Sequence, residues 1–182
     1  ILEKGNGPFK VIFNGSSSQV FDFTSGSITG NVDFVVESGS TLAFSTPTMA
    51  IITSGKFRTK PSSTIEISSP LGIDASGVTG HIQTPNQVLD ATASYVYKAT
   101  GASVTGSGLP SNVDNLTVSS TTSLSVSQSV SVNGSFSNFG EVIFEDYVSL
   151  NSTGAVTETG DVTLKRNFST SNIWYEINFA VK

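Results

Sequence analysis

Short runs of strand-forming residues, each ended within a few positions by turn-forming residues, limit the folds open to this 182-residue sequence. In the second half the runs follow one another at intervals of about six to nine residues, and apolar side chains take every second position. This is the period of a half-buried β-strand. Gly, Pro or paired Ser interrupts each segment before three helical turns could form, so the pattern predicts an all-β protein. The alternating pairs are Leu116 and Val118, Leu124 and Val126, Val130 and Val132, Val142 and Phe144, Val148 and Leu150, and Val162 and Leu164.

Two all-β architectures satisfy this pattern. A β-sandwich joins longer antiparallel strands with turn signals about every 8–12 residues. A β-solenoid stacks rungs of about 20 residues, each with roughly three short strands lying parallel on the rung below. The spacing favours the solenoid, with the β-sandwich as the alternative. One predicted rung comprises Thr117–Val118, Leu124–Val126 and Val130–Val132, and the next Phe136, Val142–Phe144 and Val148–Leu150. In the first half, strands are predicted at 9–13, 20–23, 32–36, 41–44, 48–53, 56–58 and 64–67.

Hydroxyl groups rather than charges are expected to cover the outside of such a coil. Only 13% of residues are charged, and Ser and Thr can hydrogen-bond along a stacked column where like charges would repel.

A net charge of −5 disfavours nucleic acid as a partner. The absence of cysteine excludes disulfides and thiolate metal sites. With no apolar run near the ~20 residues of a membrane helix, we expect no membrane insertion, and no cofactor is predicted. Because the chain opens at Ile1 without a signal peptide, we expect a mature or excised segment.

The segment from Ser69 to Gly134 carries a family resemblance. It contains SPLGIDASGVTGHIQT, ASYVYKATGASVTGSGLPSNVDNLTVSS and SLSVSQSVSVNGSFS in succession. These motifs resemble the repeat of very large secreted surface proteins of the Bacteroidetes, and the match covers about residues 65–137. The characteristic positions are Gly72, Ile73, Gly80, Tyr95, Tyr97, Gly106, Leu109, Pro110, Asn115, Leu116, Asn133 and Gly134.

The resemblance implies a right-handed parallel β-helix in an adhesin-like repeat protein, exported by the type nine secretion system. On this basis residues 1–165 form the β-helix segment, and residues 166–182 are terminal strands that lead into a following domain. The secretion machinery would be a partner during export. The expected location is extracellular or on the bacterial cell surface.

Enzymatic activity is the more specific alternative, since right-handed β-helices also serve as polysaccharide lyases and hydrolases. Such sites need several carboxylates converging on one face. The acids here are scattered, and the densest group is Glu141, Glu145 and Asp146, which we interpret mainly as solvated turn residues. His81 is the only histidine, and no pattern of catalytic or metal-ligating residues accompanies it in the sequence. It is therefore interpreted as an exposed or hydrogen-bonded strand residue. No catalytic or metal-binding residue is predicted.

Ligand contacts are predicted at two kinds of residue. Aromatic rings could stack on sugar faces, although one ring of each pair could instead be core. Alternating basic residues would share one strand face and could meet an acidic glycan, or serve as a solvated face that discourages edge pairing. The candidate residues are Trp174, Tyr175, Tyr95 and Tyr97 for stacking, and Lys56, Arg58 and Lys60 for the basic stripe.

The sequence therefore predicts a non-enzymatic β-helical segment of a large secreted or cell-surface protein, serving adhesion or gliding motility through a surface glycan or protein partner. A carbohydrate-binding or polysaccharide-degrading β-helix is the alternative. A trimeric phage or viral fibre segment is a third hypothesis.

Overall fold

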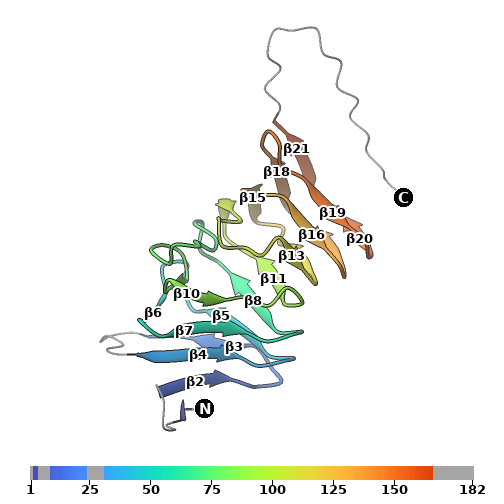
Figure 1. The fold of residues 1–182 in the computed structure, drawn as a ribbon. Helices are drawn as coiled ribbons and strands as arrows, with labels where there is room; N and C mark the ends of the chain where they lie inside the picture. Colours follow the sequence, from blue (N-terminus) through green and yellow to red (C-terminus); the bar gives the residue numbers. More distant parts are fainter. Residues whose placement is uncertain (1, 4–8, 24–30, 166–182) are drawn as a thin grey trace, which may run out of the picture.

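The chain forms a β-solenoid of parallel strands, in a computed structural model that describes residues 2–3, 9–23 and 31–165. Figure 1 shows the strands stacked in a tall coil that rises from the N-terminal to the C-terminal end. All strand pairs are parallel except that β1 (Leu2–Glu3) runs antiparallel to β2 (Phe9–Phe13), among the residues described. The predicted parallel β-solenoid is thus confirmed, and the β-sandwich alternative is wrong.

One sheet runs the length of the coil and fixes the number of rungs. It has seven strands, each paired in parallel with the equivalent strand of the next rung. The strands are β3 (Gln19–Phe21), β5 (Thr41–Phe44), β8 (Thr64–Ile67), β11 (Ser94–Tyr97), β14 (Leu116–Val118), β17 (Phe136–Asn138) and β20 (Val156–Glu158). We call this the long sheet.

The other sides of the coil change composition halfway along. In the first half they consist of one sheet with β1, β2, β4 (Val32–Val36), β7 (Lys56–Thr59) and β10 (Asn86–Val88), and a pair formed by β6 (Ile51–Ile52) and β9 (Ile82–Gln83). In the second half one sheet contains β12 (Gly101–Val104), β15 (Thr122–Val126), β18 (Glu141–Phe144) and β21 (Asp161–Leu164). The other contains β13 (Asn112–Val113), β16 (Val130–Val132) and β19 (Leu150–Ser152).

The rung length predicted for the second half is confirmed by the strand register. Leu116 pairs with Phe136, and Phe136 pairs with Val156, each 20 residues further along. The step from Ile65 to Tyr95 is 30 residues, because residues 68–81 form a loop on the side of the coil. The register also pairs Leu124 with Val142 and Val130 with Leu150, so both predicted second-half rungs are correct in outline.

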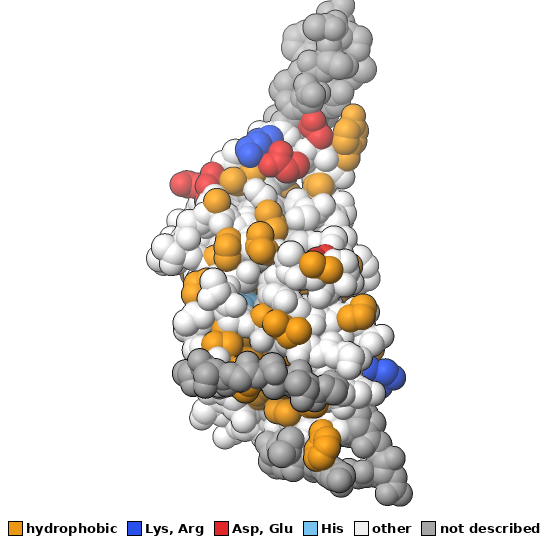
Figure 2. Space-filling view, turned by 90° about the vertical axis from the view of Figure 1, so that its left-hand side faces the viewer, with side chains coloured by type: hydrophobic (Ala, Val, Ile, Leu, Met, Phe, Trp, Pro, Cys, Tyr) orange, Lys and Arg blue, Asp and Glu red, His pale blue; other side chains and the backbone are white. Residues whose placement is uncertain are grey.

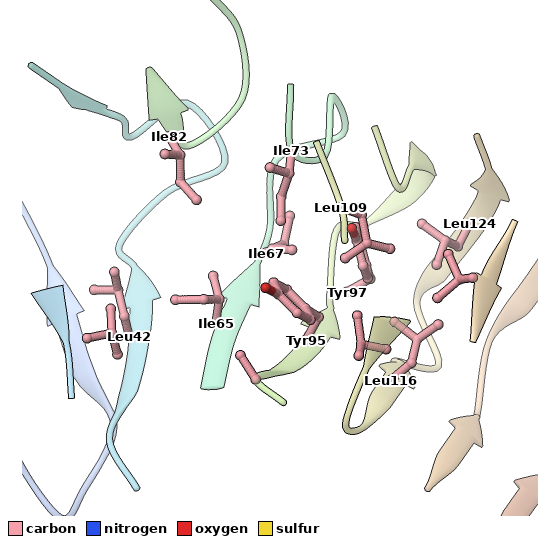
Figure 3. Packing of buried hydrophobic residues seen from close by; sticks show 14 of the residues in the cluster. Leu42, Ile65, Ile67, Ile73, Ile82, Tyr95, Tyr97, Leu109, Leu116 and Leu124 are labelled. Carbon is pink, nitrogen blue, oxygen red and sulfur yellow. The ribbon is translucent and has the colours of Figure 1, made fainter. Parts of the chain in front are cut away.

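The core is built from columns of inward side chains. On the long sheet, Leu42, Ile65, Tyr95 and Leu116 follow one another from rung to rung and are fully buried. Figure 3 shows these side chains side by side, pointing into the coil from successive strands. Each buried side chain of this size contributes roughly 1.5–3 kcal/mol through the hydrophobic effect, so the columns stabilise the whole length of the stack.

The outer surface is mostly polar, as the hydroxyl-rich composition predicts. Figure 2 shows a face on which hydrophobic side chains lie singly among polar ones, with few charged groups. Isolated apolar residues of this kind are normal on soluble surfaces. No helix that is long and apolar enough to cross a bilayer occurs among the described residues.

Candidate functional site

A shallow hollow opens at one corner of the coil, between the long sheet and the sheet of β15, β18 and β21. It arises because corners in successive rungs differ in length. Val118 pairs with Asn138, 20 residues later, whereas Ser123 pairs with Glu141, only 18 residues later. The corner between β14 and β15 therefore has two more residues than the corners between β17 and β18 and between β20 and β21. It projects as a ledge below these two tighter corners. We call this site of about 360 Å³ the corner hollow; it is lined by Ser120, Thr121, Thr122, Ser123, Phe139, Gly140, Glu141, Thr159, Gly160 and Asp161.

Two glycines make the upper corners tight enough to recess the wall of the corner hollow. A Cβ atom on Gly140 would lie 2.3 Å from the carbonyl oxygens of both Ser119 and Thr122. A Cβ atom on Gly160 would lie 1.9 Å from the carbonyl oxygen of Gly140. Real Cβ atoms do not approach backbone oxygens this closely, so only glycine allows the stacked corners to pack.

Two acidic residues that line the corner hollow are stacked on adjacent strands. Glu141 and Asp161 are register partners in β18 and β21; Glu141 is half-buried beside the inward Val142, and Asp161 is exposed. The Glu141 carboxylate accepts hydrogen bonds from the Ser123 hydroxyl, at 2.5 Å, and from the Thr163 hydroxyl, at 2.8 Å. These two hydrogen bonds, with a smaller contribution from the charge of Lys165, lower the pKa of Glu141. Glu141 is therefore ionised at neutral pH.

The lining of the corner hollow also combines an aromatic ring with hydroxyl groups. Phe139 is 43% exposed although it immediately precedes the tight corner at Gly140. Ser120, Thr121 and Thr159 add hydroxyls that can donate or accept hydrogen bonds. The site thus offers one apolar face for stacking and several hydrogen-bonding groups, two of them anionic.

A metal centre is not apparent in the part of the chain that the structure describes. No group of three or more His, Asp or Glu side chains lies close enough there to hold an ion.

Glu141 belongs to the densest group of acids in the sequence, but the corner hollow was not predicted. Phe139 and Asp161 were missed. The signal was present as two similar segments, FGEV at residues 139–142 and TGDV at 159–162, in which a glycine and an acid recur after 20 residues.

Of the four predicted stacking residues, the structure describes two, and these do not reach the surface. Tyr95 and Tyr97 are fully buried, so the expectation that they reach a ligand is corrected. Both rings occupy successive inward positions of β11, and Val96 between them faces outward. Trp174 and Tyr175 lie outside the described residues.

The predicted basic stripe does share one outward face. Lys56 and Lys60 are exposed and Arg58 is half-buried, whereas the intervening Phe57 and Thr59 point inward. Acidic groups lie beside this stripe and weaken its attraction for polyanions.

Two carboxylates flank the basic stripe. The backbone N–H of Lys56 donates to the Asp33 carboxylate at 2.8 Å. The pKa of Asp90 is lowered mainly by hydrogen bonds from Thr92, and to a smaller extent by the positive charge of Lys60. Contact with an acidic glycan remains a prediction.

The acids and the histidine considered for catalysis are not brought together. Glu145 and Asp146 lie at the turn after β18, as predicted, and Glu145 forms an ion pair with Lys165 at 3.1 Å. His81 is 2% exposed and lies just before β9. Its Nε2 accepts hydrogen bonds from the backbone N–H groups of Ser68 and Ser69, so it is a hydrogen-bonded structural residue.

A hydrogen-bonded loop at residues 68–81 is the second local feature of the surface. The Asp74 carboxylate accepts hydrogen bonds from Ser76, Val78 and Thr79, five in all. The hydrogen bond from the Ser76 hydroxyl contributes most, and together they lower the pKa of Asp74 to about 2. The loop docks on the coil because Gly108 donates from its backbone N–H to the carbonyl of Ile73 at 2.7 Å.

Comparison of the chain with protein-family models, with curated proteins and with solved structures found no match.

Proposed function

We propose that this chain is a non-enzymatic, rigid segment of a large secreted or cell-surface bacterial protein, in which the β-solenoid serves as a spacer for adhesion or gliding motility. The observation that carries the proposal is the uninterrupted ladder of the long sheet through seven rungs. Parallel strand pairs join each rung to its neighbours along this sheet, and we expect this stacking to resist bending and compression.

Resistance to proteolysis follows from the same architecture and suits a protein exposed outside the cell. The backbone of each strand is hydrogen-bonded to the rungs on either side, and buried columns hold the strands in register. Proteases require locally unfolded chain. The longest insertion in the register, at residues 68–81, is itself fixed by the hydrogen bonds to Asp74.

Export by the type nine secretion system in a member of the Bacteroidetes is part of this proposal. Its support is the resemblance of residues 65–137 to repeats of large surface proteins, together with a parallel β-solenoid over the same residues. The low charge and hydroxyl-rich outer face are consistent with an extracellular structural role.

Surface labelling of the source bacterium tests the proposal. An antibody raised against the 182-residue chain should label intact cells or the culture medium, and labelling should be lost when type nine secretion is disabled. Beads coated with the chain should adhere to cells or to their extracellular matrix more than beads coated with its heat-denatured form. Labelling that appears only after lysis would contradict the proposal. So would release of reducing sugars from polysaccharides that is abolished in the Glu145→Gln/Asp146→Asn variant.

A further inference from the structure

We propose that the corner hollow binds a neutral oligosaccharide, with Phe139 stacked against a sugar face and the Glu141 and Asp161 carboxylates accepting hydrogen bonds from sugar hydroxyls. This inference goes beyond the spacer role, since it assigns a ligand class to a defined site on the outer surface. It does not depend on where the parent protein resides, because binding is measured on the isolated chain.

The mixture of groups in the corner hollow matches the chemistry of a sugar. A sugar ring presents a face of C–H groups, which packs on an aromatic ring, and a rim of hydroxyls, which donate to carboxylates. Phe139 leaves 43% of its surface open beside the hollow. Asp161 is exposed, and no described residue donates a hydrogen bond to its carboxylate. An acceptor with free capacity therefore lies near an open apolar surface.

The charge of the site selects against anionic ligands. Glu141 and Asp161 are stacked on adjacent parallel strands, about 4.8 Å apart along the coil axis. The hydrogen bonds from Ser123 and Thr163 lower the pKa of Glu141 and keep it charged. The nearby cation Lys165 is paired with Glu145 at 3.1 Å. A uronic acid polymer or a nucleic acid would meet two negative charges, whereas a neutral sugar would not.

The stacked geometry also suits a chain rather than a single sugar. The wall of the hollow repeats from rung to rung, since the Phe139–Glu141 corner and the Thr159–Asp161 corner present glycine and an acid at equivalent places. Hydrogen-bonding groups therefore recur along the coil axis. A polysaccharide, whose hydroxyls also recur, can contact both corners at once.

Calorimetric titration of the 182-residue chain with a panel of neutral hexasaccharides tests the inference. The panel contains cellohexaose, xylohexaose, mannohexaose and maltohexaose, with hexagalacturonate as the anionic comparison. At least one neutral member should bind, and hexagalacturonate should not. Phe139→Ala and Asp161→Asn should each weaken binding about tenfold, through loss of stacking and of a charged acceptor respectively.

Tyr147→Ala is the matched control, because Tyr147 is 97% exposed in the same rung but does not line the corner hollow. It should leave affinity unchanged. The inference is overturned if no neutral member binds, if hexagalacturonate binds as well as the best neutral sugar, or if Tyr147→Ala weakens binding as much as Phe139→Ala. Heat from CaCl₂ alone that disappears in Asp161→Asn would instead show a cation site and would also overturn it.

Discussion

The imidazole of His81 lies flat on the ring of Phe44 inside the coil, with ring centroids 4.0 Å apart and planes 3° from parallel. Its Nδ1 is 2.5 Å from the carbonyl oxygen of Met49, so Nδ1 donates. Its Nε2 accepts from the backbone N–H groups of Ser68 and Ser69, at 3.0 Å and 2.8 Å. One neutral tautomer satisfies all these contacts. His81 thereby joins the loop at 68–81 to the rung below it.

Acid should weaken the fold through His81. Burial lowers the pKa of His81 below its ordinary value of 6.5, so the unfolded chain binds this proton more readily than the folded chain. The stabilising contribution is fully present above about pH 6.5 and is lost as the pH falls from there through the folded pKa. Urea titrations at pH 7.5, 6.5, 5.5 and 5.0 should show a falling unfolding free energy. His81→Gln should be less stable at pH 7.5 and nearly independent of pH over this range. A flat profile for the unsubstituted chain would refute the assignment.

The two buried tyrosines should respond differently to loss of the hydroxyl. The Tyr97 hydroxyl donates to the carbonyl of Thr105 at 2.8 Å, so Tyr97→Phe should cost about 1 kcal/mol of unfolding free energy. The Tyr95 hydroxyl has no hydrogen-bond partner among the described residues. Thr59 is close enough to affect the pKa of Tyr95, but the two groups are not in hydrogen-bonding geometry. Tyr95→Phe should be neutral or stabilising. Equal losses measured by chemical denaturation would contradict this difference.

Asp74 should control the order of its loop more than the stability of the coil. Asp74→Ala removes the acceptor for the backbone N–H groups of Ser76, Val78 and Thr79. Hydrogen exchange at these three amides should become much faster, while exchange in β8 and β11 stays slow. In the unsubstituted chain the same amides should lose protection only as the pH falls from about 3.8 toward 2, because the pKa of Asp74 is about 2. Protection that survives in Asp74→Ala would argue against this role.

Replacing Gly140 at the corner hollow is expected to destabilise the fold. Its missing Cβ would meet two backbone oxygens at 2.3 Å, so Gly140→Ala should lower the unfolding free energy by about 3 kcal/mol, at the upper end for overpacking. Gly39 is the control, since it has a φ of 74° but nothing within 4 Å of a Cβ atom. Gly39→Ala should cost only the backbone strain, about 1 kcal/mol. If the order of the two losses is reversed, the account of the corner is wrong.

The repeat and the inward face could be predicted because apolar alternation carries that information directly. Leu116 and Val118, Leu124 and Val126 all point inward and are fully buried. Their register partners lie close to the predicted 20-residue period. The signal is weaker where inward positions are polar, as at Asn138, which is buried and donates to the carbonyl of Asp161 at 3.1 Å.

The corner hollow and the loop at residues 68–81 could not be predicted from the alternation of apolar and polar residues. The hollow depends on a difference of two residues between neighbouring corners, which appears only when Val118 and Ser123 are aligned with their partners. His81 was interpreted as a strand residue, but it ends the loop at residues 68–81, in which Gly72 and Gly80 have φ values of 62° and 75° and turn the chain. The expectation allowed only one ring of the Tyr95 and Tyr97 pair to be core, but residues two apart share one face of a strand, and β11 buries both rings.

The central claim is that strands stack in register from rung to rung, and the absence of native cysteine permits a direct test. Thr117 pairs with Ser137, and Ser137 pairs with Thr157, all facing outward on the long sheet. Adjacent partners lie about 4.8 Å apart, within reach of a disulfide, whereas Thr117 and Thr157 are two rungs apart. Under mild oxidation, mass spectrometry of the monomer should find a crosslink in Thr117→Cys/Ser137→Cys and none in Thr117→Cys/Thr157→Cys. Equal crosslinking of both pairs, or crosslinking of the second pair alone, would contradict the stacked coil.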